Sequence, residues 1–204
     1  MDFTAEIKGH TLEYFDDEHM YLVDGLIVPS ITQILKLKFG RKYESINDLV
    51  LKRASNAGTA VHEAIEAFYT KGIESDMKEV RNIKFLQKKY GFEVIDNEVP
   101  VILFKDDEPI SAGRLDLVLY MDGEIGGADI KRTSSLDKEY LFYQLNLYRI
   151  GYQQCYGEEW QFLRGIHLKD DIRKFVKIPI NADMAWQLVE EYLEANNGNK
   201  NNVR

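Results

Sequence analysis

The stretch 113–131 constrains the fold of this chain more than any other. It contains two runs of strand-forming residues joined by Asp122-Gly123, a dipeptide that accepts the positive φ values of a two-residue hairpin turn. With this turn, Asp116 comes opposite Asp129. Lys131 follows Asp129 by two residues, so the period of a strand predicts that both side chains share a face. The sequence therefore predicts two carboxylates and one ammonium group at the same point of a sheet.

Two alternatives stay open on the hairpin alone. Gly126-Gly127 offers a place for a β-bulge, which would shift the pairing by one residue and move a side chain to the other face. Asp116 and Asp129 also suit strand-end acids that face water, with Lys131 as a solvated edge charge. Carboxylates on directly opposed residues repel unless a proton or a cation lies between them. If the register holds, the hairpin favours a metal-dependent hydrolase.

The length and composition favour one globular domain. The 204 residues are 45% hydrophobic and 29% charged, ordinary values for a chain with a sizeable core. No apolar run approaches the roughly 18 residues of a membrane span, and a signal-like N-terminus is absent, so we expect a cytoplasmic protein. We expect a single domain over 1–195, made of an N-terminal β meander (1–28), a core (29–180) and a C-terminal helix (181–195), followed by a polar tail (196–204).

Charge and cysteine content exclude several classes of protein. The net charge of −8 counts against a simple nucleic-acid coat protein, but not against an enzyme that meets phosphates through bound cations. The single cysteine, Cys155, excludes an intrachain disulfide and any four-cysteine zinc or iron–sulfur site within one chain. The sequence lacks a glycine-rich phosphate loop ending in Lys-Ser/Thr, which argues against ATP hydrolysis.

Periodicity and turn residues predict antiparallel strands with helices before and after them. This order is typical of an α/β (α+β) domain with a central mixed β-sheet flanked by helices. Ser30 and Gln33 form a capping-box pair that begins a short helix reaching about Leu37. Over 46–69 we expect two helices, the first ending at Gly58 and the second capped by Thr59. The other predicted elements are strands at 10–15, 20–23, 26–28, 92–95, 98–104, 160–168 and 175–180, and helices at 76–90, 137–155 and 183–195.

Two of these helices carry further polar candidates. His62 lies at the edge of the apolar stripe of its helix, with Glu66 one turn later. A single histidine in such a place is more often a core residue than a ligand. Gln144 and Tyr148 are spaced i and i+4, so they project from the same face of the long helix.

A divalent cation suits the predicted hairpin. Mg²⁺ prefers hard oxygen ligands, which the Asp116 and Asp129 carboxylates and the Ile130 carbonyl supply, and an added imidazole shifts the preference towards Mn²⁺. Such an ion lowers the pKa of a bound water and polarises a phosphoryl oxygen. Lys131 is expected to position that water or to stabilise charge on the pentacovalent phosphate. Together these parts fit the hydrolysis of a phosphodiester.

At these residues the sequence resembles the RecB-type exonuclease branch of the PD-(D/E)XK nuclease superfamily. Asp-X-Lys alone is a weak motif, but here four segments occur in order and on the expected helix, strand, strand and helix. The segments are Gly58–His62, Gly113–Asp116, Asp129–Lys131 and Gln144–Tyr148. The meander leading into Val28-Pro29-Ser30 also resembles standalone phage-encoded and mitochondrial members.

The resemblance implies a restriction-endonuclease-like PD-(D/E)XK core and a role for each matching residue. His62, Asp116 and Asp129 would be metal ligands, and Lys131 the catalytic lysine beside the two acids. Gln144 and Tyr148 would line the DNA strand and support the site. The residues expected to assist are Glu66 as a partner of His62, Glu98 before a strand, and Arg114, Arg132 and Thr133 as phosphate contacts.

The resemblance also implies an activity, a Mg²⁺- or Mn²⁺-dependent DNA exonuclease that leaves 5′-phosphate and 3′-hydroxyl ends. Its substrate would be single strands or duplex ends in DNA recombination, repair or replication, without a membrane. An iron–sulfur cluster is not expected, because the cysteines that bind it in CRISPR-associated and helicase-fused members are absent. A structure-specific endonuclease on the same fold and a catalytically silent DNA- or protein-binding module of a recombination complex remain alternatives.

Overall fold

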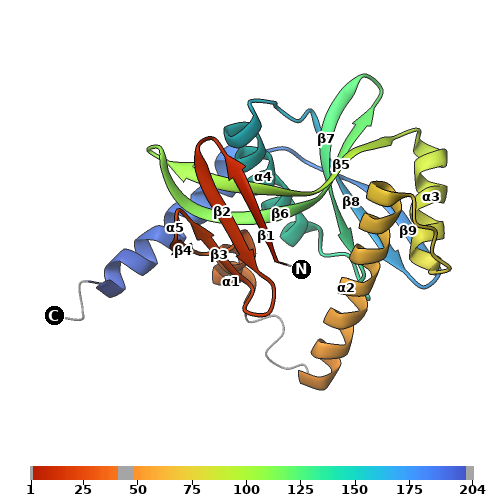
Figure 1. The fold of residues 1–204 in the computed structure, drawn as a ribbon, viewed down its shortest axis with the longest axis horizontal. Helices are drawn as coiled ribbons and strands as arrows, with labels where there is room; N and C mark the ends of the chain where they lie inside the picture. The colour runs from red at the N-terminus through yellow and green to blue at the C-terminus, as the bar shows by residue number, and fades with distance from the viewer. Residues whose placement is uncertain (1, 41–47, 201–204) are drawn as a thin grey trace.

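The residues that the structure describes fold into two β-sheets and five helices (Figure 1). The structure is a computed structural model that describes residues 2–40 and 48–200. A small antiparallel sheet contains β1 (Phe3–Ile7), β2 (His10–Phe15), β3 (Met20–Val23) and β4 (Leu26–Val28) in sequential order. This confirms the predicted strands of the N-terminal meander and adds β1, which was not predicted.

The second sheet is the predicted central mixed sheet. Its strands are β5 (Glu93–Lys105), β6 (Glu108–Met121), β7 (Glu124–Lys131), β8 (Phe162–Lys169) and β9 (Ile172–Ile178). Strands β7 and β8 run parallel, and all other neighbours are antiparallel. A parallel pair needs a crossover connection, which here contains the long helix α4 (Lys138–Tyr156).

Helices cover both faces of the central sheet. The helices α1 (Ile31–Phe39), α4 and α5 (Ala182–Lys200) share one apolar cluster with the sheet. A second cluster joins the sheet to α2 (Asp48–Lys71) and α3 (Lys78–Tyr90). The small sheet packs through a third cluster onto β5 and β6, which pass behind it in Figure 1. The mixed α+β class is therefore confirmed.

Several local predictions can be compared with the helices directly. Both bonds of the capping box at the start of α1 are present. Helix α5 continues to Lys200, past the predicted end at residue 195, and the rest of the predicted polar tail, 201–204, lies outside the described residues. Within the described part of the chain, no helix is both long and apolar enough to cross a membrane.

The prediction of two helices over 46–69 was wrong, because α2 is continuous from Asp48 to Lys71. Its predicted start at residues 46 and 47 lies outside the described residues. Gly58 stays helical, since a glycine inside a helix costs only about 1 kcal/mol relative to alanine and the flanking turns are made regardless. Thr59 caps nothing, and its hydroxyl donates to the carbonyl of Ser55 one turn earlier (3.2 Å).

The predicted hairpin register is confirmed over the paired part of β6 and β7. Met121 pairs with Glu124 and Leu117 with Ala128, and Asp122 and Gly123 have φ values of 55° and 87°. The ladder contains no bulge at the two glycines. A Cβ on Gly126 would lie 2.4 Å from the Phe162 ring, and one on Gly127 would lie 2.2 Å from Trp160. The glycines therefore allow close packing, which explains them without a register shift.

Beyond that ladder the sheet divides at Asp116. Strand β6 pairs with β7 only up to Leu117, so Asp116 and Asp129 do not form the predicted ladder pair. The alternation of β6 also changes phase here, because Leu115 packs in the α4 cluster whereas Leu117 packs in the α2 cluster. Opposite Asp116 on β5, Glu98 has a left-handed backbone with φ +52°. We call this point, where β7 separates from β6, the fork.

Candidate metal centre

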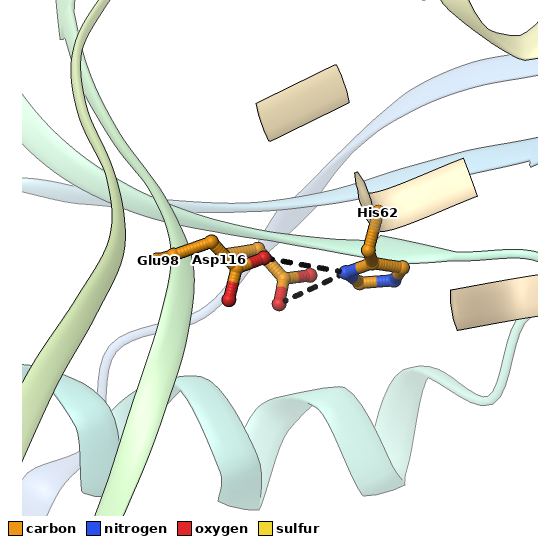
Figure 2. A group of neighbouring side chains, drawn as sticks. All are labelled: His62, Glu98 and Asp116. Atoms are coloured by element: carbon orange, nitrogen blue, oxygen red, sulfur yellow. Dashed lines mark ion pairs between the residues drawn. The ribbon is translucent and has the colours of Figure 1, made fainter. Parts of the chain in front are cut away.

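Three side chains from α2, β5 and β6 meet at the fork, as Figure 2 shows. His62 Nδ1 lies 3.4 Å from Asp116 Oδ1 and 3.9 Å from Glu98 Oε1. One potential ligand atom from each residue lies within 4.8 Å of the other two. The His62 side chain is 28% exposed, so the cluster is open to solvent. An imidazole and two carboxylates at this spacing form a donor set for a divalent cation.

The separation of the strands gives Asp116 its position. Because β7 has left the ladder, the N–H of Ile130 has no backbone partner on β6, and it donates instead to the side-chain oxygen Asp116 Oδ2 (2.6 Å). This bond fixes one carboxylate oxygen and leaves Oδ1 directed at His62. The contact seen for Ile130 thus comes from its N–H, and the role of its carbonyl as a ligand stays a prediction.

Glu98 enters the cluster through an unusual backbone and a cationic partner. Its left-handed φ interrupts the alternation of β5 and re-aims the side chain, and such strained residues are enriched at functional sites. Arg114 Nε lies 2.6 Å from Glu98 Oε2, which leaves Oε1 on the His62 side. The Arg114 guanidinium also lies 5.6 Å from the ring centres of Phe3 and Tyr14 in the small sheet. Sequence reasoning gave Glu98 only a supporting role, because its approach to Asp116 depends on pairing between distant strands.

Asp129 and Lys131 form a second group beside the cluster. Lys131 Nζ lies 2.6 Å from Asp129 Oδ2, and the Asp129 side chain is only 2% exposed. The two side chains share a face of β7, as predicted from the period of two. Asp129 lies outside the group formed by His62, Glu98 and Asp116, so its role as a metal ligand stays a prediction.

The charges at the fork are strongly coupled. Burial alone would lower the pKa of His62, but the Asp116 and Glu98 carboxylates raise it well above its usual value. Burial alone would raise the pKa of Asp116, yet the His62 and Lys131 cations and the Ile130 N–H lower it. Burial raises the pKa of Asp129 to about 6, with Lys131 opposing and Asp116 adding to the shift. The cluster therefore stabilises positive charge, whether carried by a proton on His62 or by a metal ion.

Helix α4 covers the fork with one row of side chains. Tyr140, Gln144 and Tyr148 are spaced by four residues and share a face. At one end of the row, Lys131 Nζ lies 5.7 Å from the centre of the Tyr140 ring. At the other end, Tyr148 packs against Gly113 of β6. Gln144 lies between them in the row, and its buried Oε1 has no hydrogen-bond partner among the described residues.

Gly113→Ala is expected to destabilise the protein by about 1–3 kcal/mol through overpacking. An added Cβ would lie 2.9 Å from Tyr148 Cε1 and 3.2 Å from Ile31 Cδ1. The free energy of unfolding in urea measures the effect. Gly58→Ala is the matched control, since its Cβ meets nothing within 4 Å and we expect about 0.5–1 kcal/mol of stabilisation there. Equal effects of both variants would contradict the packing described for Gly113.

Two of the predicted assisting residues, Arg132 and Thr133, have partners outside the cluster, and a third, Glu66, is not bonded to His62. Arg132 Nε lies 2.9 Å from the buried Glu79 of α3, so the guanidinium joins β7 to α3. The Thr133 hydroxyl donates to the Ser135 carbonyl, and the Thr133 carbonyl accepts a hydrogen bond from His167 Nε2 (2.7 Å). No hydrogen bond or ion pair joins Glu66 to His62 in the part of the chain that the structure describes. Phosphate contacts by Arg132 and Thr133 stay predictions.

Metal binding is expected to release about one proton per ion at pH 7. In the metal-free protein, the raised pKa of His62 keeps its imidazole protonated, and a metal ion must displace that proton. Affinity for Mn²⁺ should therefore rise with pH until the pH passes the pKa of His62. Titration calorimetry in buffers of different ionisation enthalpy measures the released protons. Binding without proton release would contradict a role for His62 as a ligand.

Comparisons with known proteins add little to this geometry. No family model matches the chain, and no curated protein matches it. Among solved structures, one described as "Crystal structure of SSO0001" is 14% identical, with a TM-score of 0.47, and the match covers 83% of this chain and 76% of that one. A likeness of this size supports no conclusion about function.

Proposed function

We propose that this protein is a metal-dependent DNA exonuclease on a PD-(D/E)XK core, hydrolysing phosphodiester bonds to 5′-phosphate and 3′-hydroxyl ends. The observation that carries the proposal is the fork, where His62, Glu98 and Asp116 meet beside the Asp129–Lys131 ion pair. A purely structural cluster would not need an open donor set next to a buried lysine–aspartate pair. The four sequence segments that resemble RecB-type exonucleases contain four of these five residues, all except Glu98.

The donor set fits Mg²⁺ or Mn²⁺. His62, Glu98 and Asp116 would hold the ion, and Asp129 lies close enough to Asp116 for the two charges to affect each other's protonation. When bound, such an ion supplies Lewis-acid polarisation of a phosphoryl oxygen and a more acidic bound water. The imidazole favours Mn²⁺ relative to a site made of oxygen alone.

The residues around the cluster bind and orient the reactants. The Lys131 ammonium pairs with Asp129, and in this proposal it orients the attacking water and neutralises charge developing on the phosphate. The pKa of Lys131 is raised because the Asp129 and Asp116 carboxylates outweigh its burial, so it stays protonated. Gln144 Oε1 is available to accept a hydrogen bond from the same water. Arg114 holds Glu98 in its orientation.

The test is degradation of linear DNA labelled at one end, single- and double-stranded, with Mg²⁺, Mn²⁺ or EDTA. The wild type should release nucleotides only when metal is present. Comparison of DNA labelled at the 5′ end with DNA labelled at the 3′ end gives the polarity, because the end that is attacked loses its label first. A covalently closed circle should stay intact, because an exonuclease needs an end. Cleavage of the circle would replace the proposal by an endonuclease. Binding of DNA without any cleavage would replace it by the binding-module alternative.

A further inference from the structure

A cavity of about 280 Å³ is lined by Gly113 of β6, which precedes Asp116 of the fork by three residues. Its walls include the rings of Tyr14 and Tyr21 from the small sheet and Tyr148 from α4. Ile31 and Gly113 also line it, so the close approach of Tyr148 to Gly113 forms part of its wall. The volume is at the lower end of the range for small-molecule sites, which suits one flat ring system rather than a duplex.

The hydroxyl of Tyr148 is a second, independent feature of this cavity. Tyr148 is only 4% exposed, and among the described residues its hydroxyl makes no hydrogen bond. Burial raises the pKa of Tyr148 well above its usual value, so the hydroxyl keeps its proton. A hydroxyl at a cavity wall that makes no bond within the protein is a donor that a ligand with polar edge atoms would satisfy.

The mouth of the cavity has a different character from its walls. It is formed at the N-terminus of α1, where Thr32 and Gln33 are exposed, and Lys36 lies one turn further along the helix. The Ser30 side chain already accepts from the Gln33 N–H, so the cap itself is satisfied. Lys36 and the helix dipole attract an anion here. Aromatic walls, a polar end and a cationic mouth match a nucleobase that carries a sugar phosphate.

We infer that this cavity binds one unpaired nucleobase of the DNA substrate, with the base against the tyrosine rings and its phosphate at Thr32 and Lys36. The inference rests on the proposed function for the identity of the substrate. The cavity and the metal centre are linked through one short segment, because Gly113 lines the cavity while Arg114 and Asp116 belong to the centre. A base inserted here must be out of a duplex, so the protein selects single-stranded DNA or frayed ends.

The test is equilibrium binding of deoxythymidine 5′-monophosphate in EDTA, measured by calorimetry beside 2-deoxyribose 5-phosphate. Stacking and hydrogen bonding of the base should make the nucleotide bind roughly five- to a hundredfold more tightly than the sugar phosphate. Thr32→Trp should weaken nucleotide binding about tenfold or more, since the new ring fills the mouth. Tyr148→Phe removes only the hydroxyl and should weaken binding roughly three- to tenfold.

Leu37→Trp is the matched control, because it adds the same ring to the same helix at an exposed position that does not line this cavity. It should leave nucleotide binding unchanged. Equal binding of nucleotide and sugar phosphate, no binding of either, or full binding by Thr32→Trp would overturn the inference. EDTA removes divalent cations, so metal-dependent binding at the fork does not contribute to this assay. If the protein cleaves DNA but does not bind the nucleotide, only the base site is wrong. If it binds the nucleotide but does not cleave DNA, only the proposed nuclease activity is wrong.

Discussion

Lys131→Ala is expected to slow DNA cleavage by about 10²–10³-fold while metal binding persists. Lys131 is not one of the three candidate ligands, and its ion-pair partner is Asp129. Loss of the ammonium group removes stabilisation of the charge that develops on the phosphate. The measurements are the single-turnover cleavage rate and the increase in melting temperature caused by Mn²⁺.

A second effect of this substitution needs its own control. Without Lys131, the pKa of Asp129 should rise above its present value of about 6. The Asp129 carboxyl of the variant should then be protonated at neutral pH. Raising the pH to about 9 restores the charge of Asp129, but it should not restore the rate. Lys177→Ala on β9 changes an exposed lysine of the same sheet and should leave the rate unchanged. Recovery at high pH would show that Lys131 acts only through Asp129.

Asp116→Asn should abolish the stabilisation of the protein by metal ions as well as its activity. An ion present at one hundred times its dissociation constant stabilises a folded protein by about 2.7 kcal/mol, which thermal unfolding detects readily. The amide keeps the shape of the carboxylate and still accepts the Ile130 N–H through its oxygen, so the fork should stay folded. What is lost is the negative charge with which Asp116 would bind the ion.

The control for this change is Asp171→Asn. Asp171 is 93% exposed and pairs only with the surface residue Lys78 in the described part of the chain. Its variant should be stabilised by Mn²⁺ as much as the wild type is. If Asp116→Asn also retains the full stabilisation, the ion binds elsewhere, and the metal centre at the fork is wrong whatever the cleavage assays give.

Local chemistry explains what the sequence predicted well. The hairpin turn follows from Asp122-Gly123, because this pair accepts a left-handed backbone, and the turn then fixes the register of four further residue pairs. The start of α1 follows from Ser30 and Gln33, whose side chains satisfy each other's backbone groups. In both places, neighbouring residues contain all the atoms that decide the structure.

The features that were missed depend on distant parts of the chain. No residue near Asp116 in the sequence indicates that β7 leaves β6 there. Glu98 joins the cluster only because β5 brings it opposite Asp116 with a left-handed backbone, which its sequence neighbours do not predict. Gly58 was assigned to a helix end from its local propensity, but the packing of α2 outweighs that preference.

The contacts of Arg114 bear on how folding follows the synthesis of the chain. The side chain joins Phe3, near the start of the chain, to Glu98 in its middle. Contacts between such distant residues close late in folding, because a long loop must be ordered first. On the ribosome, a chain synthesised as far as Met121 already contains His62, Glu98 and Asp116 but not Lys131. The growing polypeptide therefore contains the three candidate metal ligands before it contains the lysine to which the proposal gives a catalytic role.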